Sequence, residues 1–339
     1  MNLIAPRPGG AVQRLLGVAP QPLAAAMQQA MARIAGPPLS STPLGEIVAF
    51  LQPEPPDRLL GGQKARLRLL AGWQQRLEAA CQIGPFLPAD PAAALLPTTA
   101  WAPVLEASAT ALAAALARDG ASQEWQLTLG WPPAQLLAPH RAALQPWQGA
   151  APAALAAEIG RLVAAEMAAR IAAVEAALAG VTRQWRRQPA ATPHEASFLL
   201  LIERDGMAGL EAALQGLPPA LAEAASADLR GPMPPVHFAA WRVAECRPDA
   251  LRQAWSLLGL GEGADAASLR RSWRRRAAAL HPDASRAAAD GAAMASARDA
   301  YRLLAPLLRE AGTDLPGLLR QAGPRLVPAE TPEGAWDDR

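Results

Sequence analysis

The chain has 339 residues, of which 51 % are hydrophobic, and its formal net charge at pH 7 is only +2. This length suits two or three domains with sizeable cores. The near-neutral charge argues against a protein that binds nucleic acid over much of its surface, so we expect no nucleic-acid partner. The two cysteines, Cys81 and Cys246, have neither CxxC nor disulfide-framework spacing, which predicts reduced thiols in a cytoplasmic protein.

No segment is expected to cross or anchor in a membrane. The N-terminal apolar stretch is short and broken by Pro20 and Pro22, unlike a signal peptide. The most membrane-like window, residues 91–117, contains three prolines and Glu106. Prolines interrupt a spanning helix of about 20 residues, so we predict a loop followed by an amphipathic helix.

Residues 1–90 mix helical and strand patterns and are predicted to form an N-terminal α/β domain. Apolar residues recur every three or four positions over residues 20–36 and 62–81, which predicts two helices. Between them, residues 45–53 read as a short strand bounded by Gly45 and Pro53. The proline-punctuated residues 82–91 are expected to be non-helical.

Residues 91–247 are predicted to form a helical plus α+β domain. A helix over 104–118 precedes a half-buried strand, 124–131, in which Trp125, Leu127, Leu129 and Trp131 share one face. The longest helix is expected over about 152–186, as a packing helix or a coiled-coil arm, with Glu166 and Arg170 as an i,i+4 pair. The remaining elements are expected to be a strand at 195–203, a short helix at 206–217 and two extended pieces within 227–243.

After Pro248 we expect helices and no further strands. Five arginines occupy seven positions in "RRSWRRR", and the helix that carries them runs into His281-Pro282-Asp283. Pro282 cannot continue that helix, and Asp265 is placed to cap its beginning. Residues 248–310 are predicted to form a small all-α domain, and residues 311–339 are predicted to be a disordered tail because they are polar and proline-rich at the end.

This helical pattern resembles a J-domain, the module by which co-chaperones recruit Hsp70. The resemblance covers about residues 250–306 and includes "LLGL", Trp273 in the usual aromatic slot, the tripeptide and "ARDAYRLL". It departs from the family at Arg276, where an apolar residue is usual. The resemblance implies an Hsp70 partner. It also implies an Hsp70-binding site, comprising His281, Pro282, Asp283, Arg270, Arg271, Arg274 and Arg275.

A second resemblance concerns the preceding residues. "FLLLIE", a helix and "GPMPPVHF" (231–238) resemble the C-terminal part of the gas vesicle GvpL/GvpF family, which typically has Gly-Pro-Trp-Pro-Pro-Tyr-x-Phe. "EWQLTLGW" resembles the Glu-Trp strand of that family. Two aromatics of the motif are replaced here, by Met233 and Val236, and Leu87 stands where the family has an arginine. Taken alone, the Gly-Pro-x-Pro-Pro segment is equally a rigid turn between strands.

The fold expected from these patterns is α+β: ferredoxin-like α/β domains with long packing helices, followed by a small all-α J-domain. No enzyme motif is present in the sequence. The four histidines have no metal-ligand spacing, and "GLGEGA" joins two helices rather than following a strand. We therefore predict a non-enzymatic protein with no catalytic residue, no metal site and no cofactor.

The resemblances imply a cytoplasmic, gas vesicle-associated assembly factor. Its body would bind the gas vesicle shell protein or other gas vesicle accessory proteins, and its J-domain would recruit and stimulate Hsp70. Three alternatives remain open at this point: a general Hsp70 co-chaperone for unrelated clients, a structural gas vesicle component with an inactive J-like domain, and nucleic-acid binding by the arginine-rich helix.

Overall fold

The computed structural model describes residues 11–54, 62–147, 149–218, 226–280, 290–311, 315–320 and 323–329. These residues form two compact units. Within the described ranges, the first unit contains residues 11–120 and 239–329, and the second contains residues 121–238. The chain therefore leaves the first unit, builds the second, and returns.

The first unit contains an antiparallel sheet with strand order β2-β3-β1-β4, and a further short strand, β5, pairs with β1. The chain order is β-α-β-β-α-β, and with this strand order it is the ferredoxin-like arrangement. The elements are β1 (Val12–Pro20), α1 (Ala24–Ala32), β2 (Ser40–Leu44), β3 (Ile47–Pro53), α2 (Gln63–Ile83), β4 (Leu87–Pro88) and β5 (Leu95–Pro97).

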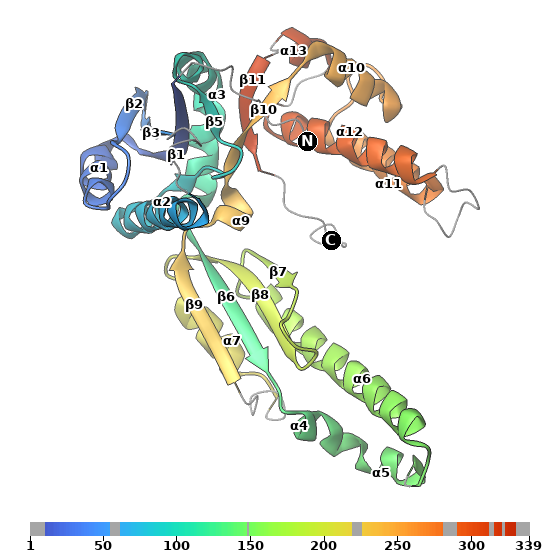
Figure 1. The fold of residues 1–339 in the computed structure, drawn as a ribbon. Helices are drawn as coiled ribbons and strands as arrows, with labels where there is room; N and C mark the ends of the chain where they lie inside the picture. The colour runs from blue at the N-terminus through green and yellow to red at the C-terminus, as the bar shows by residue number, and fades with distance from the viewer. Residues whose placement is uncertain are drawn as a thin grey trace. The chain divides into compact units, whose positions relative to one another are not determined.

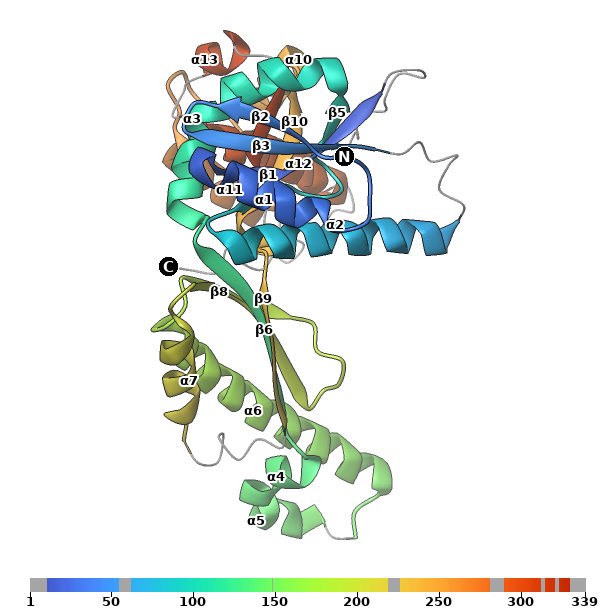
Figure 2. The ribbon, with the colours of Figure 1, turned by 90° about the vertical axis from the view of Figure 1, so that its left-hand side faces the viewer.

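Both faces of this sheet are covered by helices. In Figures 1 and 2, α1 and α2 lie over one face, and α3 (Trp101–Asp119) lies over the other. The first six residues of β3, 47–52, are consequently all buried. Ile47, Ala49 and Leu51 join the core beneath α3, and Phe50 packs on the opposite side against Phe86, with ring centroids 6.4 Å apart. Alternate strand residues thus supply two hydrophobic layers.

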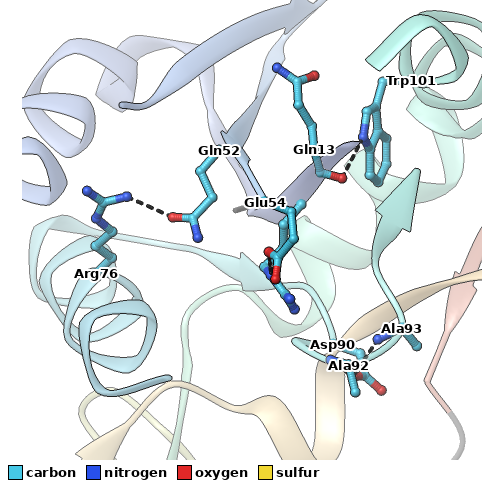
Figure 3. Close-up of polar contacts among 9 residues, drawn as sticks. Gln13, Gln52, Glu54, Arg76, Asp90, Ala92, Ala93 and Trp101 are labelled. Carbon is cyan, nitrogen blue, oxygen red and sulfur yellow. Dashed lines mark hydrogen bonds and ion pairs between the residues drawn. The ribbon is translucent and has the colours of Figure 1, made fainter. Parts of the chain in front are cut away.

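Helix α3 is the predicted amphipathic helix. With the preceding 3-10 turn it spans Thr98–Asp119 and is, among the described residues, the one helix long and apolar enough to cross a membrane. Its apolar face is nevertheless used inside the protein, where Trp101, Leu105 and Leu112 are buried in the core of the first unit. The Trp101 indole N–H donates to the Gln13 carbonyl oxygen at 3.1 Å, which anchors the helix on β1 (Figure 3).

The same unit contains a helical cluster beside a two-stranded antiparallel sheet of β10 and β11. Leu251 and Trp255 of α10, Leu269 of α11 and Leu304 of α12 meet in one core, and Trp273 stacks on Tyr301 with 5.2 Å between centroids. The elements are β10 (Trp241–Cys246), α10 (Pro248–Leu257), α11 (Ala266–Leu280), α12 (Asp290–Ala311), α13 (Leu315–Arg320) and β11 (Gly323–Pro328).

The two-stranded sheet joins two hydrophobic cores. Trp241 and Leu326 belong to the core beneath α3, whereas Cys246 and Val327 belong to the core of the helical cluster. Leu326 and Val327 are adjacent, so their side chains point to opposite faces of β11. One short strand therefore contributes to both cores.

The second unit repeats the β-α-β-β-α-β order. Its antiparallel sheet has the strand order β7-β8-β6-β9, again the ferredoxin-like arrangement. Figure 1 shows α6 and α7 on one face of these strands. There, Leu127 and Phe198 pack against Ile171 and Val174 of α6. The main elements are β6 (Ser122–Gly130), α4 (Pro133–Leu137), α6 (Pro152–Ala179), β7 (Gln184–Gln188), β8 (Glu195–Glu203), α7 (Met207–Gln215) and β9 (Ser226–Met233).

Several structural predictions made from the sequence are confirmed. The mixed α+β class is correct, and β8 has the bounds expected from the sequence. Trp125, Leu127 and Leu129 of β6 and the following Trp131 all pack in the core beneath α6. Arg170 is 4 % exposed and forms the expected ion pair with Glu166 at 2.9 Å.

Other predictions are wrong. Strands β1 and β2 were not expected. The long helix ends at Ala179 rather than near 186, and Trp185 lies in β7, where it packs edge-on against Phe198. Strands do not stop at Pro248, because residues 323–328 of the expected tail form β11 and residues 315–320 form α13. The two compact units also do not coincide with the expected boundaries at residues 90 and 247.

We predict that a chain ending at Arg320 is destabilised by roughly 3 to 6 kcal/mol, because Leu326 and Val327 are 5 % and 2 % exposed and burying such a side chain contributes about 1.5 to 3 kcal/mol. Urea unfolding followed by tryptophan fluorescence measures the loss. A chain ending at Ala329 keeps β11 and is the matched control. Equal unfolding midpoints for the two truncated chains would contradict the role assigned to β11.

Candidate functional site

The segments that resemble the GvpL/GvpF family come together on β6. Glu124, on the side of the sheet away from α6, is 2 % exposed. It accepts a hydrogen bond from the backbone N–H of His237 at 3.0 Å, and its other oxygen lies 2.6 Å from the His237 Nδ1 atom. A buried carboxylate needs such partners. The Glu-Trp strand and the "GPMPPVHF" segment are thus joined through one side chain.

A close approach between the same two segments lies one residue further along. Strand β6 pairs with β9, and the register shifts between Glu124 and Gln126. Gly231 has φ +153°, and a Cβ atom there would lie 2.6 Å from the Trp125 indole. Any side chain at this position would collide with that ring, so glycine is required where β9 passes Trp125.

Arg186 of β7 completes the group. Its guanidinium lies 4.4 Å from the centroid of the Phe238 ring, a cation–π geometry. Burial lowers the pKa of Arg186 to about 10, and the negative charge of Glu124 opposes that shift. At neutral pH, Arg186 therefore remains charged.

His237 is the titratable member of this cluster. Its pKa is raised, chiefly by the hydrogen bond to Glu124 and further by the charge of that carboxylate, while burial and Arg186 act in the opposite direction. The residue lies in a short helix, α9 (Val236–Ala239), and not in a strand as expected from the sequence. Its side chain is 53 % exposed, so an imidazolium here remains in contact with water.

This arrangement is suited to holding a segment in place. The contacts of Glu124, Trp125 and Arg186 described above connect β6 and β7 to residues 231–238. Gly231–Met233 continue β9 and Val236–Ala239 form a helical turn, so the segment is a strand end, a proline turn and a short helix. The chemistry is that of a structural clamp, which we call the Glu124 clamp.

The second group of sequence-predicted site residues lies in the helical cluster. Arg270, Arg271, Arg274 and Arg275 are exposed on α11, and none of them forms an ion pair within the described residues. Asp265 caps this helix as expected, because its carboxylate accepts the Ser268 N–H at 2.7 Å. Hydrogen bonding by the Ser268 side chain, and then by its backbone N–H, lowers the pKa of Asp265.

The packing of α11 follows the inward face predicted from its sequence. Leu269 is buried in the helical-cluster core, and Trp273 and Leu280 pack against it. Arg276, the departure from the family, is exposed. His281, Pro282 and Asp283 lie outside the described residues, which resume at position 290. The structure thus places the four arginines on one exposed helix but does not relate them to the tripeptide.

Among the described residues, no group of three or more histidine, cysteine, aspartate or glutamate side chains could hold a metal ion. Cys246 is buried, and burial raises the pKa of its thiol to about 11. Such a thiol is protonated at neutral pH and is a poor nucleophile.

The architecture defines the class: two ferredoxin-like modules in tandem, the second held together by a clamp of Glu124 against a glycine–proline segment. A family model described as "Gas vesicle synthesis protein GvpL/GvpF" matches residues 15–240. The chain belongs to this family.

A solved structure supports the fold. The chain is similar to the gas vesicle protein GvpF from Anabaena sp. PCC7120, at 13 % identity and a TM-score of 0.51, over 68 % of this chain and 98 % of that one. It also matches GvpF from Microcystis aeruginosa at 15 % identity and a TM-score of 0.45, over 67 % and 98 % of the two chains. A search of curated proteins found no match.

Sequence reasoning found the two halves of the Glu124 clamp but not their connection. The Glu-Trp strand and the glycine–proline segment were each identified by resemblance, while the bond between Glu124 and His237 spans more than a hundred residues of chain. Arg186 was missed because its segment was assigned to the long helix. The sequence feature that could have revealed it is Gly180, because a glycine commonly ends a helix and the following residues then belong to another element.

We predict that the protein loses stability as the pH rises above about 6.5, the ordinary pKa of histidine, because the pKa of His237 is higher in the folded state than in the unfolded state. The stabilising contribution is complete below the unfolded pKa and disappears as the pH passes through the folded pKa. Urea unfolding at several pH values measures the trend. His237→Gln should flatten it, and an unchanged slope in that variant would contradict the assignment.

Proposed function

We propose that this protein is a non-enzymatic gas vesicle assembly factor that binds gas vesicle shell or accessory proteins and recruits Hsp70 through its C-terminal helices. The observation that carries the first part is membership of the GvpL/GvpF family over residues 15–240. The family role in gas vesicle synthesis supports action in the cytoplasm and at the gas vesicle.

The helices after residue 247 support the second part. Three helices, α10, α11 and α12, share one core, α11 begins at an aspartate cap, and its arginines are exposed. Guanidinium groups present planar donors that match carboxylates, and a row of them steers association with an acidic surface. The tripeptide His281-Pro282-Asp283, which follows α11 in the sequence, supports a J-domain by resemblance.

Joining the two activities in one chain has a physical advantage. Shell subunits of this family are expected to be small and very hydrophobic, and such chains expose aggregation-prone surface before they assemble. A chaperone recruited by the same molecule that holds the subunit acts at a high effective concentration. The protein would thereby couple subunit capture to chaperone action.

We predict that the tagged full-length protein captures a gas vesicle shell or accessory protein from lysates of cells that express the gas vesicle genes. A matched bait with Gly231→Val, which would drive a side chain into the Trp125 ring, should capture less, because it breaks the Glu124 clamp. Capture of no gas vesicle protein by the intact bait would contradict the assembly role. It would favour the alternative of a general co-chaperone if Hsp70 stimulation persists.

We predict separately that the purified protein stimulates the ATPase of a DnaK-type Hsp70, and that His281→Gln abolishes the stimulation. A second variant, Arg270→Glu with Arg274→Glu, should weaken the stimulation, and the weakening should depend on salt. Because these arginines are exposed, the reversal should leave the fold intact. Equal ATPase rates with and without the protein would contradict Hsp70 recruitment. They would favour the alternative in which the protein is a structural gas vesicle component with an inactive J-like domain.

A further inference from the structure

A groove in the first unit holds a positive charge without a negative partner. The groove has a volume of about 350 Å³ and lies between α2, the chain that follows α1, and β3. Its lining includes two guanidinium groups, those of Arg68 and Arg76, and none of the described lining residues is an aspartate or a glutamate. The other lining residues are small, apolar or uncharged, among them Gly36, Pro37, Gln52, Leu69 and Trp73.

Arg76 is the unusual member of this lining. Its side chain is 3 % exposed, yet the acceptors that it reaches are neutral. One terminal nitrogen donates to the Gln52 side-chain oxygen at 2.7 Å, and the other donates to the Ile34 carbonyl oxygen at 3.1 Å. Figure 3 shows Arg76 extending from α2 toward Gln52 of β3. Within the described residues, no carboxylate pairs with this guanidinium.

Two N–H groups at the groove also lack acceptors. The Nε atom of Arg76 and the Nε1 atom of Trp73 are buried with no hydrogen-bond partner among the described residues. Burying a cation without a counter-charge is unfavourable, and burial accordingly lowers the pKa of Arg76. A carboxylate that entered the groove would remove this cost, because it supplies both the missing charge and the missing acceptors.

The backbone beside Arg76 is built for close approach. A Cβ atom on Gly36 would lie 2.8 Å from the Nη2 atom of Arg76 and 3.0 Å from its Cζ atom. Glycine therefore leaves room for the guanidinium at this wall of the groove. Arg68 is exposed on the same face of α2 as Arg76, two helical turns earlier, and places a second cation on the rim.

We propose that this groove binds an acidic segment of a partner protein, with one of its carboxylates paired to Arg76 and a second charge near Arg68. Nothing in this inference depends on the gas vesicle or Hsp70 assignments. The groove walls favour a peptide over a free anion, because Pro37, Leu69 and Trp73 offer apolar contact for the neighbouring side chains of the segment. Guanidinium groups pair with carboxylates through two parallel hydrogen bonds, so the groove should bind a glutamate-containing segment more tightly than a glutamine-containing one.

The test uses the full-length protein and two fluorescent peptides, one of alternating leucine and glutamate and one of alternating leucine and glutamine. Fluorescence anisotropy should show the glutamate peptide binding about tenfold more tightly or better, as expected for charge-assisted hydrogen bonds. Arg68→Gln should weaken that binding about two- to fivefold, the range of an exposed pair. Lys64→Gln is the matched control, since Lys64 is an exposed cation of α2 outside the groove lining and its loss should have little effect.

Arg76 is buried, so a second variant keeps the charge and obstructs the site. Gly36→Ala should reduce affinity for the glutamate peptide while circular dichroism confirms that the fold is retained. Equal binding of the two peptides, or equal losses in Arg68→Gln and Lys64→Gln, would overturn the proposal. Complete displacement of the glutamate peptide by inorganic phosphate at the same concentration of charge would also overturn it, because the groove would then be a site for free anions.

Discussion

The pairing of β10 with β11 is the interaction on which the architecture of the first unit depends. Trp241 pairs with Pro328 and Cys246 with Gly323, so the strand that directly follows the family-matched region is hydrogen-bonded to residues 323–328. Alternate side chains of these strands enter the core beneath α3 and the core of the helical cluster. The cluster is therefore not an appended module on a linker. The strands β10 and β11 contribute side chains both to the core of the cluster and to the core of the ferredoxin-like sheet.

Three of the described arginines, Arg170, Arg186 and Arg76, lie in different electrostatic environments. Arg170 pairs with Glu166 and lies 5.8 Å from the Trp131 ring centroid, while Arg186 lies over Phe238 within reach of the field of Glu124. Arg76 differs from both because it donates to neutral oxygens, and no described carboxylate pairs with it. Buried cations ordinarily have a compensating charge. The missing counter-charge at Arg76 is the feature that distinguishes the proposed binding groove from a structural ion pair.

Much of the fold could be predicted from local patterns. Period-two alternation identified β6, a continuous apolar run identified β8, and helical spacing identified α1, α2, α3 and α7. The missed elements have physical reasons. Strand β2 contains three hydroxyl residues and one proline and is mostly exposed, and β11 contains Pro324 and Pro328, which are unusual inside sheets and acceptable at edges. Trp185 matched a helical period by chance, although Gly180 had already ended the helix.

The candidate sites were harder to predict from the sequence than the helices and strands were. The Glu124 clamp depends on a register between β6 and β9 that no local pattern specifies, and the Arg76 groove depends on Gln52 and Gly36 meeting one turn of α2. The arginines of α11 could be predicted to be exposed because they lie opposite Leu269 on a single helix. Placement within one element follows from periodicity, whereas proximity between elements does not.

The position of β11 also has a consequence for the order of events during synthesis. Domains tend to fold as the chain emerges from the ribosome, N-terminal parts first. The first sheet and the whole second unit can form before residue 323 is translated, but β10 must wait for β11 to complete its pairing. Folding of the helical cluster is thus coupled to the synthesis of residues 323–328. A nascent chain would possess its GvpL/GvpF body before its C-terminal helices have their final support.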